Sequence, residues 1–383
     1  MPKIRFTSLP PNCGENFFGV NPSGKILATH GNSGQEIMFS GLTGLKDDEI
    51  IPFFVLKSIY LIICFCWHPT NPMIFFTGGG TMITVHQIQK NYQDGDAEEN
   101  TSVVLGELDI GEPFDSILLN QKGDLLLVLI PEKTHALLFR LCYEDGEMIF
   151  LRMEDQRIVG DDPIISADFL GDNIIGLISD DEEGSVTIQQ ICPKSGKLKN
   201  EVFGDDDLAI CKSCKFSPDK RSFVILSLDA LTLYSFSKKS FELTFIESIP
   251  LGIRYVGVDF QWHPILPLLI VLSSKNHVNI VDFYKVGKDG FTRIHQVCGL
   301  ENIQPKFFIS GFNVTFGYYS SDERCMRLTI DFEDLARFPV EQMLTIRKAL
   351  TANLQIDDLV AKILSILYND HLSIDRCAHL MWT

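Results

Sequence analysis

Cysteine pairs are the first residues of this sequence whose types and spacing could support chemistry. Cys64-x-Cys66 and Cys211-x-x-Cys214 each place two thiols close together, as zinc sites do. Neither pair is followed by a second Cys or His pair at zinc-finger spacing. In an extended strand Cys64 and Cys66 share one face, as Cys214 and Phe216 do, which suits a core position. We therefore predict reduced, structural thiols and no metal ligands.

Glycines and histidines are the next candidates. Gly78, Gly79 and Gly80 precede "TMITV" instead of the Gly-Lys-Ser/Thr that opens a phosphate-binding helix, so we predict a β-turn there. The nine histidines show no H-E-x-x-H spacing, and no Gly-x-Ser-x-Gly motif is present. His68 and His263 occupy equivalent turns of a repeat, which favours a structural role. We predict no catalytic residue and no cofactor.

The overall charge limits the kinds of partner. The chain has 383 residues, and its 50 acidic against 33 basic residues give a formal net charge of −17. This charge repels a phosphate backbone, so direct nucleic-acid binding is not expected. The N-terminus has no apolar signal segment, and we expect an intracellular protein with reduced cysteines.

A repeat of about forty-eight residues organises most of the chain. Each copy reads as an apolar stretch, a Pro, Gly or Asp turn, a second apolar stretch, another polar turn and a third β-rich stretch. Less regular fourth strands follow, such as 241–249 and 291–298. The first turns are 46 to 52 residues apart and lie near Pro22, Pro69, Gln121, Gly171, Pro218, Pro264 and Gly311. This pattern predicts an all-β fold, a seven-bladed β-propeller of four-stranded antiparallel blades.

The apolar segment before the second of these turns looks at first like a membrane span. It is "IIPFFVLKSIYLIICFCW", which Pro52 and Lys57 interrupt and the turn "HPTNP" ends. A spanning helix needs about 20 uninterrupted apolar residues, so we predict no membrane insertion. We expect Leu61 to Trp67 to form an inner strand that neighbouring blades cover on both faces.

The sequence from 1 to 332 resembles the WD-repeat propeller family. "CKFSPDKRSFVILSLDALTLYSF" and the two Trp-His-Pro turns, at 67–69 and 262–264, carry the resemblance. The Gly-His and Trp-Asp dipeptides of the family are missing from every copy, which makes the chain a divergent member. The family often closes its ring with an N-terminal strand, and we expect residues 3–9 to complete blade seven.

The pattern changes to helical spacing after the repeats. Residues 333–383 form a predicted helical extension, either packed against the propeller or offering an apolar face to a partner. The candidate partner-binding residues are Leu335, Val340, Met343, Leu344, Leu350, Leu359, Ile363 and Leu367.

Acidic runs lie between the predicted strands. We favour a solvated rim, and the alternative is a surface that attracts a basic partner. The runs are 47–49, 94–99, 161–162, 180–183 and 205–207.

Two classes of function follow from these features. We favour a non-catalytic scaffold that binds other protein subunits of a complex, because a repeat without a catalytic constellation suits that role. WD-repeat proteins similar to this one are platforms in nuclear-pore, messenger-RNA decay, chromatin and ubiquitin-ligase complexes, and the resemblance does not choose among them. We prefer a nuclear-pore or RNA-processing assembly, in the nucleus or nuclear envelope in preference to the cytoplasm. A substrate-receptor adaptor of a ubiquitin ligase is one alternative. Another is a propeller hydrolase with a metal in the central channel, for which Asp168 and Asp259 are the carboxylates to test.

Overall fold

All elements of the computed structural model are β-strands in the part of the chain that it describes. That part comprises residues 3–8, 17–22, 26–31, 34–41, 51–89, 101–133, 135–159, 163–169, 173–179, 186–192, 198–203, 211–217, 221–237, 239–251, 256–263, 266–275, 278–301, 303–310, 313–319 and 325–331. The predicted helical extension, its eight candidate residues and all five acidic runs lie outside these ranges. Within them, no helix is long and apolar enough to cross a membrane.

The strands pair into four-stranded antiparallel sheets. Sheet one contains β2 (Phe17–Val20), β3 (Ile26–His30), β4 (Glu36–Gly41) and β5 (Ile51–Lys57). Sheet two contains β6 (Cys64–Trp67), β7 (Ile74–Gly79), β8 (Met82–Gln89) and β9 (Thr101–Asp109). Sheet three contains β10 (Ser116–Leu119), β11 (Leu125–Leu129), β12 (His135–Glu144) and β13 (Glu147–Val159). Sheet four contains β14 (Ile164–Phe169), β15 (Ile174–Ser179), β16 (Val186–Ile191) and β17 (Leu198–Phe203).

The remaining sheets follow the same plan until the last. Sheet five contains β18 (Cys211–Phe216), β19 (Ser222–Ser227), β20 (Ala230–Ser237) and β21 (Glu242–Pro250). Sheet six contains β22 (Val256–Trp262), β23 (Leu268–Lys275), β24 (Val278–Gly287) and β25 (Gly290–Glu301). Sheet seven contains β26 (Ile303–Ser310), β27 (Asn313–Tyr319), β28 (Cys325–Asp331) and, at its outer edge, β1 (Lys3–Ser8).

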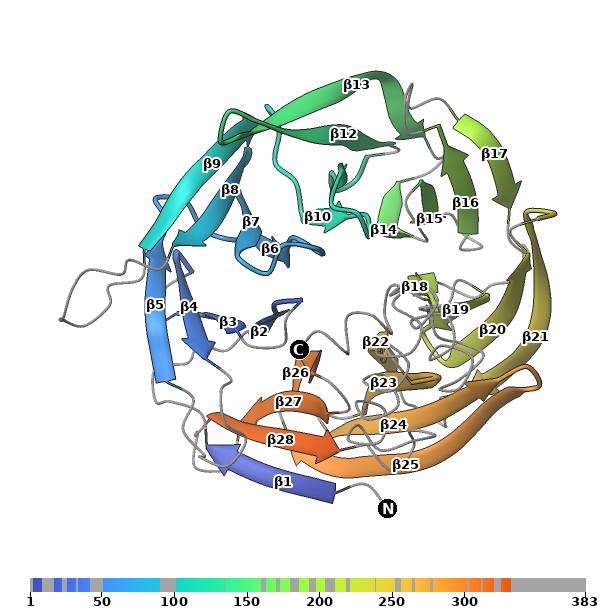
Figure 1. Ribbon diagram of the computed structural model, residues 1–383. Helices are drawn as coiled ribbons and strands as arrows, with labels where there is room; N and C mark the ends of the chain where they lie inside the picture. The colour runs from blue at the N-terminus through green and yellow to red at the C-terminus, as the bar shows by residue number, and fades with distance from the viewer. Residues whose placement is uncertain are drawn as a thin grey trace, which may run out of the picture.

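The sheets stand around a common centre, with the first strand of each sheet innermost (Figure 1). Each inner strand contacts the next one around the ring, and β26 of sheet seven contacts β2 of sheet one. The antiparallel all-β prediction is therefore confirmed for the described residues. The division at residue 332 into a propeller and an extension stays a prediction.

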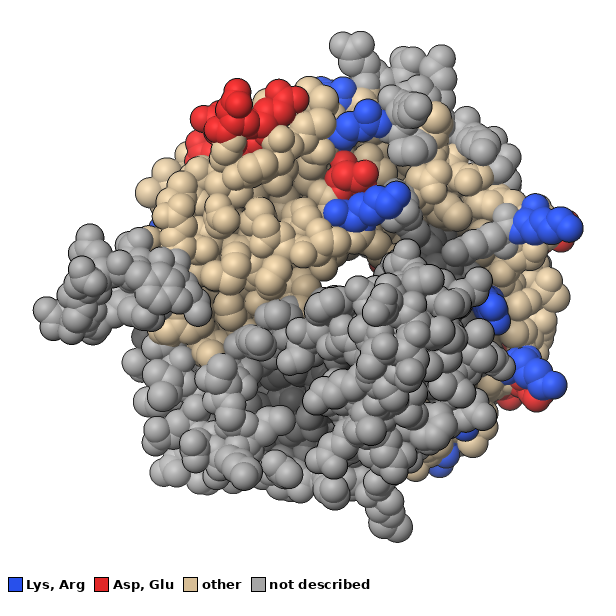
Figure 2. Space-filling model, in the orientation of Figure 1, with Lys and Arg blue, Asp and Glu red and all other residues tan. Residues whose placement is uncertain are grey.

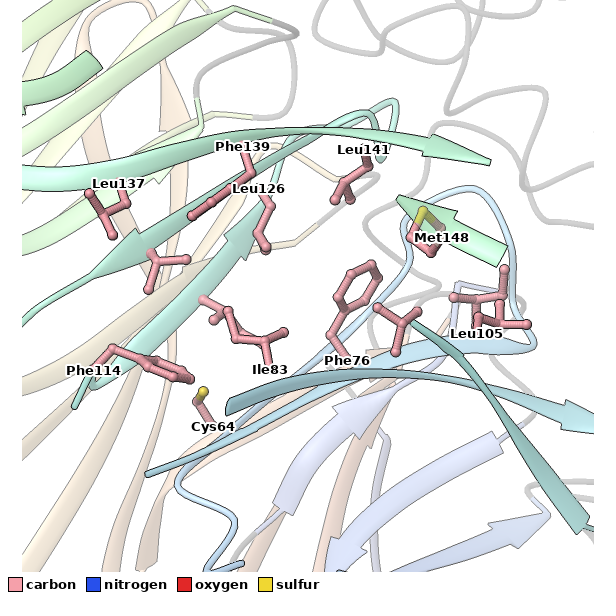
Figure 3. Close-up of a cluster of buried hydrophobic side chains, with 14 of the residues drawn as sticks. Cys64, Phe76, Ile83, Leu105, Phe114, Leu126, Leu137, Phe139, Leu141 and Met148 are labelled. Carbon is pink, nitrogen blue, oxygen red and sulfur yellow. The ribbon is translucent and has the colours of Figure 1, made fainter. Parts of the chain in front are cut away.

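Apolar side chains between neighbouring sheets form the core. Phe75 and Phe76 are both completely buried and lie on opposite faces of β7. Phe75 packs in the cluster shared with sheet one, and Phe76 in the cluster shared with sheet three (Figure 3). A strand that neighbouring sheets cover on both faces carries consecutive apolar residues. This burial explains the Phe75-Phe76 pair, and no membrane contact is needed to account for it.

The turn after the first strand is built alike in most sheets. In five of them, the side chain of the residue that begins this turn accepts a backbone N–H from further along it, as Asx and Ser/Thr turns do. These residues are Asn21, His68, Asn120, Ser217 and His263.

One strand prediction is wrong at its start. The expected doubly covered strand Leu61–Trp67 begins only at Cys64. Residues 58–63 instead form a loop that leads from the outer strand β5 of sheet one to the inner strand β6 of sheet two. Within it Leu61 and Ile63 are 59% and 41% exposed, because only the neighbouring Ile62 reaches between the sheets.

Candidate protein-interaction surface

The thiols of the two cysteine pairs lie in the core wherever the structure describes their side chains. Cys64 packs between sheets two and three, and Cys214 between sheets four and five. Burial, and then the neighbouring Cys64, raise the pKa of the Cys66 thiol well above its ordinary value. A buried, protonated thiol is a poor nucleophile and a poor metal ligand.

His68 and His263 act as turn caps. Nδ1 of His68 accepts the backbone N–H of Asn71 at 3.1 Å, and Nδ1 of His263 accepts that of Leu266 at 3.1 Å. Burial lowers the pKa of His68, so its ring is neutral at neutral pH and Nδ1 is available as an acceptor. These contacts agree with the structural role that their equivalent positions predict.

The two channel carboxylates are not brought together as a metal cage. Asp168 lies on β14 and Asp259 on β22, and sheet five stands between their sheets. The Asp259 carboxylate is 3.0 Å from Nζ of Lys215 on β18 and also accepts the N–H of Phe260 at 2.7 Å. An ion pair with a lysine competes with a metal for the same oxygen atom. The described residues contain no group of three His, Cys, Asp or Glu side chains placed to hold a metal ion.

An exposed apolar segment is the most distinctive surface feature of the described chain. It is the loop Ser58–Ile63, which we call the 58–63 loop. Ile59 is 81% exposed, Tyr60 48%, Leu61 59% and Ile63 41%. Single exposed apolar residues are ordinary, but four within five positions make the loop a candidate interaction site.

The 58–63 loop is fixed by its backbone and by one buried anchor. The N–H of Ile62 donates to Gly34 O at 2.8 Å, and the N–H of Ile63 donates to Gly78 O at 2.9 Å. The side chain of Ile62 is only 4% exposed and packs in the core between sheets one and two. The exposed side chains of the loop are therefore presented by an ordered backbone.

Two glycines let the loop lie close to the sheets. A Cβ on Gly34 would lie 2.3 Å from Cδ1 of Leu61, and a Cβ on Gly79 would lie 2.0 Å from the carbonyl oxygen of Leu61. Gly79 is one of the three glycines that suggested a phosphate loop. Its role in the structure is to allow this close approach at the β7–β8 turn.

Several carboxylates lie on the same face of the ring as the 58–63 loop. The loop from β9 to β10 joins this face, because the N–H of Ile110 donates to Thr81 O at 2.8 Å in the β7–β8 turn. Asp109, at the end of β9, is exposed, and hydrogen bonds from the Thr81 side chain and the Gly111 N–H lower its pKa. Glu112, in the loop from β9 to β10, forms an ion pair of 3.7 Å with Lys133.

The other face carries the turns after the first strands and the hairpins between third and fourth strands. Figure 2 shows acidic side chains gathered at the rim over β12 and β13. The β12–β13 hairpin supplies the exposed residues Glu144, Asp145 and Glu147. Polar side chains dominate this tip, in contrast to the apolar 58–63 loop.

The sequence contained one signal for the 58–63 loop that periodicity did not use. Lys57 and Ser58 interrupt the apolar run, and Lys57 ends β5 with its side chain 78% exposed. The residues after them have strong β-propensity, which is why a strand was predicted there. Their exposure depends on the path between two sheets, which local propensity does not encode.

Comparison with known proteins gives the fold alone. No protein-family model matches the chain, and no curated protein matches its sequence. Its structure is similar to the crystal structure of the β-propeller domain of Cps50 (Swd1) from Myceliophteria thermophila, with a TM-score of 0.61 and 10% sequence identity. The match covers 85% of this chain and 99% of that domain. The chain is thus a divergent β-propeller.

Proposed function

We propose that this protein is a non-catalytic interaction scaffold, a seven-bladed, WD-repeat-like propeller that binds other protein subunits of a larger intracellular complex. The observation that carries the proposal is the 58–63 loop, an ordered backbone that holds four apolar side chains in solvent. Such side chains gain free energy when a partner covers them.

Two further features support the scaffold over an enzyme. Asp259 is paired with Lys215, so it is not offered to a channel metal. The cysteines and histidines that suggested chemistry in the sequence serve packing and turns. We place the protein in an assembly of the nuclear-pore or RNA-processing type, in the nucleus or nuclear envelope, by analogy with WD-repeat propellers.

Affinity purification tests this proposal. The full-length protein and a form without residues 334–383 are purified from cells at native expression. We expect stoichiometric protein partners in the full-length sample. Partners that persist without the extension bind the propeller, and partners that disappear bind the predicted helices and their apolar stripe.

A metal titration tests the alternative function, a propeller hydrolase with a metal in the central channel. Tight calorimetric binding of Ca²⁺ or Zn²⁺ that is lost in the variants Asp168→Asn and Asp259→Asn would establish the hydrolase class instead. Purification of the chain without any stoichiometric partner would also count against the scaffold.

A further inference from the structure

The direction of the strands limits which molecule could cover the exposed side chains of the 58–63 loop, which we call its occupant. Successive antiparallel strands alternate in direction, so the β3–β4 turn and the 58–63 loop lie on one face of the ring, and the β2–β3 turn lies on the other. In sheet seven, Asp331 ends β28 opposite Asn313, the first residue of β27. The last described residue therefore lies on the face of the β2–β3 turn. This is the opposite face from the 58–63 loop, which favours a separate molecule as the occupant of the loop.

The charges on the face of the 58–63 loop indicate the chemistry of that molecule. On this face of sheets one to three, five described carboxylates accompany two ammonium groups, a net charge of −3 (2 − 5). Both ammonium groups are already paired: Lys57 lies 3.6 Å from Glu36, and Lys133 lies 3.7 Å from Glu112. The five carboxylates belong to Glu36, Asp109, Glu112, Asp115 and Glu132.

The carboxylates on this face favour some binding partners of the apolar loop over others. Anionic lipid headgroups would meet unpaired carboxylates such as Asp115, which is exposed. A second copy of this chain carries a net charge of −17 of its own. A protein segment with lysine or arginine beside its apolar side chains satisfies both the apolar loop and these carboxylates.

We propose that the 58–63 loop and the carboxylates on its face of the ring bind a basic, amphipathic segment of a partner protein. This inference rests on the proposed scaffold function and gives it a site. Ile59, Tyr60 and Leu61 supply the apolar contact, and Asp109, Asp115 and Glu132 attract and orient the flanking cations. Because Ile62 and two backbone hydrogen bonds already order the loop, binding loses little conformational entropy.

A labelled model peptide provides the test. The probe is an amphipathic helical peptide with a Leu and Ile stripe flanked by Lys, and its Kd for the full-length protein is measured by fluorescence anisotropy. We expect Ile59→Ser with Leu61→Ser to weaken binding about tenfold or more. Phe245→Ser is the matched control, because Phe245 is a comparably exposed aromatic residue (55%) on β21. It should leave the Kd unchanged.

The charge contribution is measured with the same probe. Asp115→Asn with Glu132→Gln should raise the Kd several-fold and reduce its dependence on salt. A probe in which Glu replaces every Lys should bind far more weakly to the wild-type protein. Equal binding of the Lys and Glu probes, or equal binding to wild type and the loop variant, would overturn the proposal.

Other occupants give distinct results. If deleting residues 334–383 tightens probe binding, the extension of this chain occupies the loop. Loss of self-association in the loop variant, seen by sedimentation, would identify a second copy instead. Co-sedimentation with phosphatidylcholine–phosphatidylserine vesicles that depends on Leu61 would identify a membrane. Each outcome overturns the basic-segment proposal, whereas partners that still co-purify with the loop variant leave the scaffold function standing.

Discussion

A buried histidine makes the stability of this fold depend on pH. His86 on β8 stacks on Phe75 with ring centroids 4.9 Å apart, and its Nε2 lies 3.1 Å from the hydroxyl of Thr77. Its Nδ1 is buried without a hydrogen-bond partner. Because burial disfavours the charged ring, the pKa of His86 falls from 6.5 to about 4.

We predict that acid destabilises the protein through His86. Below pH 6.5 the unfolded chain binds a proton at this ring, but the folded chain does so only near pH 4. The free energy of unfolding therefore falls as the pH drops through this window, by at most about 3 kcal/mol. His86→Gln keeps a group that can hydrogen-bond to Thr77 and does not titrate, so urea unfolding between pH 7.5 and 4 should show a shallower dependence of stability on pH.

Comparing the pH dependence of stability in wild type and His86→Gln isolates the contribution of this histidine. Burial also raises the pKa of Asp282, which gives stability a dependence on pH of the opposite sign. That contribution is present in wild type and in His86→Gln, and it cancels in their difference. Parallel unfolding curves for the two proteins would show that His86 does not carry the effect.

At the scale of elements, specific contacts hold neighbouring sheets together. We call the interface between two neighbouring sheets a seam. Nε1 of Trp67 donates to Gly19 O, and Nε1 of Trp262 donates to Lys215 O, both at 3.3 Å. Each bond joins the inner strand of one sheet to that of the preceding sheet. The two Trp-His-Pro turns thus combine a bond across the seam from the tryptophan with a turn cap from the histidine.

We predict that Trp67→Phe and Trp262→Phe each lower the free energy of unfolding by about 1 kcal/mol. Phenylalanine retains an aromatic ring but has no N–H to donate. The bonds lie in separate seams, so the double variant should lose the sum of the two single losses. Denaturant unfolding measures all three, and single variants as stable as wild type would contradict a role for these bonds.

A third seam, between sheets two and three, depends on backbone contact. The β12–β13 hairpin lies against β9 of sheet two, where a Cβ on Gly106 would be 2.4 Å from the carbonyl oxygen of Met148. Leu105 and Met148 join the same core cluster beside it (Figure 3). Only glycine permits this approach of the two strands.

Gly106→Ala should therefore lower the free energy of unfolding by about 1–3 kcal/mol, because the added methyl group pushes the hairpin away. Gly287→Ala is the matched control. Gly287 is likewise a strand glycine, at the end of β24, but its added Cβ would meet nothing within 4 Å. Equal losses for the two variants, measured by denaturant unfolding, would show that the β9–β13 contact is not the cause.

These elements also show what sequence could predict. Paired phenylalanines such as Phe75 and Phe76 and the prolines after Val20 and Trp67 marked strands and turns, because burial on two faces and turn geometry act locally. The 58–63 loop was missed, because the exposure of Leu61 depends on which sheets it joins. The contact of Gly106 could likewise not be predicted from the sequence, because its partner Met148 lies far along the chain.

At the scale of the molecule, the ring is joined through its first and last described strands. β1 pairs antiparallel with β28 from Lys3 opposite Asp331 to Ser8 opposite Met326 (Figure 1). This pairing covers the edge of β28 that would otherwise present free backbone groups. Closing a loop of this sequence separation costs conformational entropy, which the β1–β28 pairing offsets.

Deleting residues 1–10 should lower the melting temperature by about 5 °C or more, and the exposed edge of β28 should promote self-association at high concentration. Differential scanning fluorimetry and sedimentation velocity measure the two effects. A synthetic peptide of residues 1–10 added in trans should partly restore the melting temperature, because β1 contributes through pairing and not through the chain connection. Removal of residues 374–383 controls for truncation as such. A melting temperature unchanged by the loss of residues 1–10 would mean that the ring holds without β1, and that its stability resides in the contacts between inner strands.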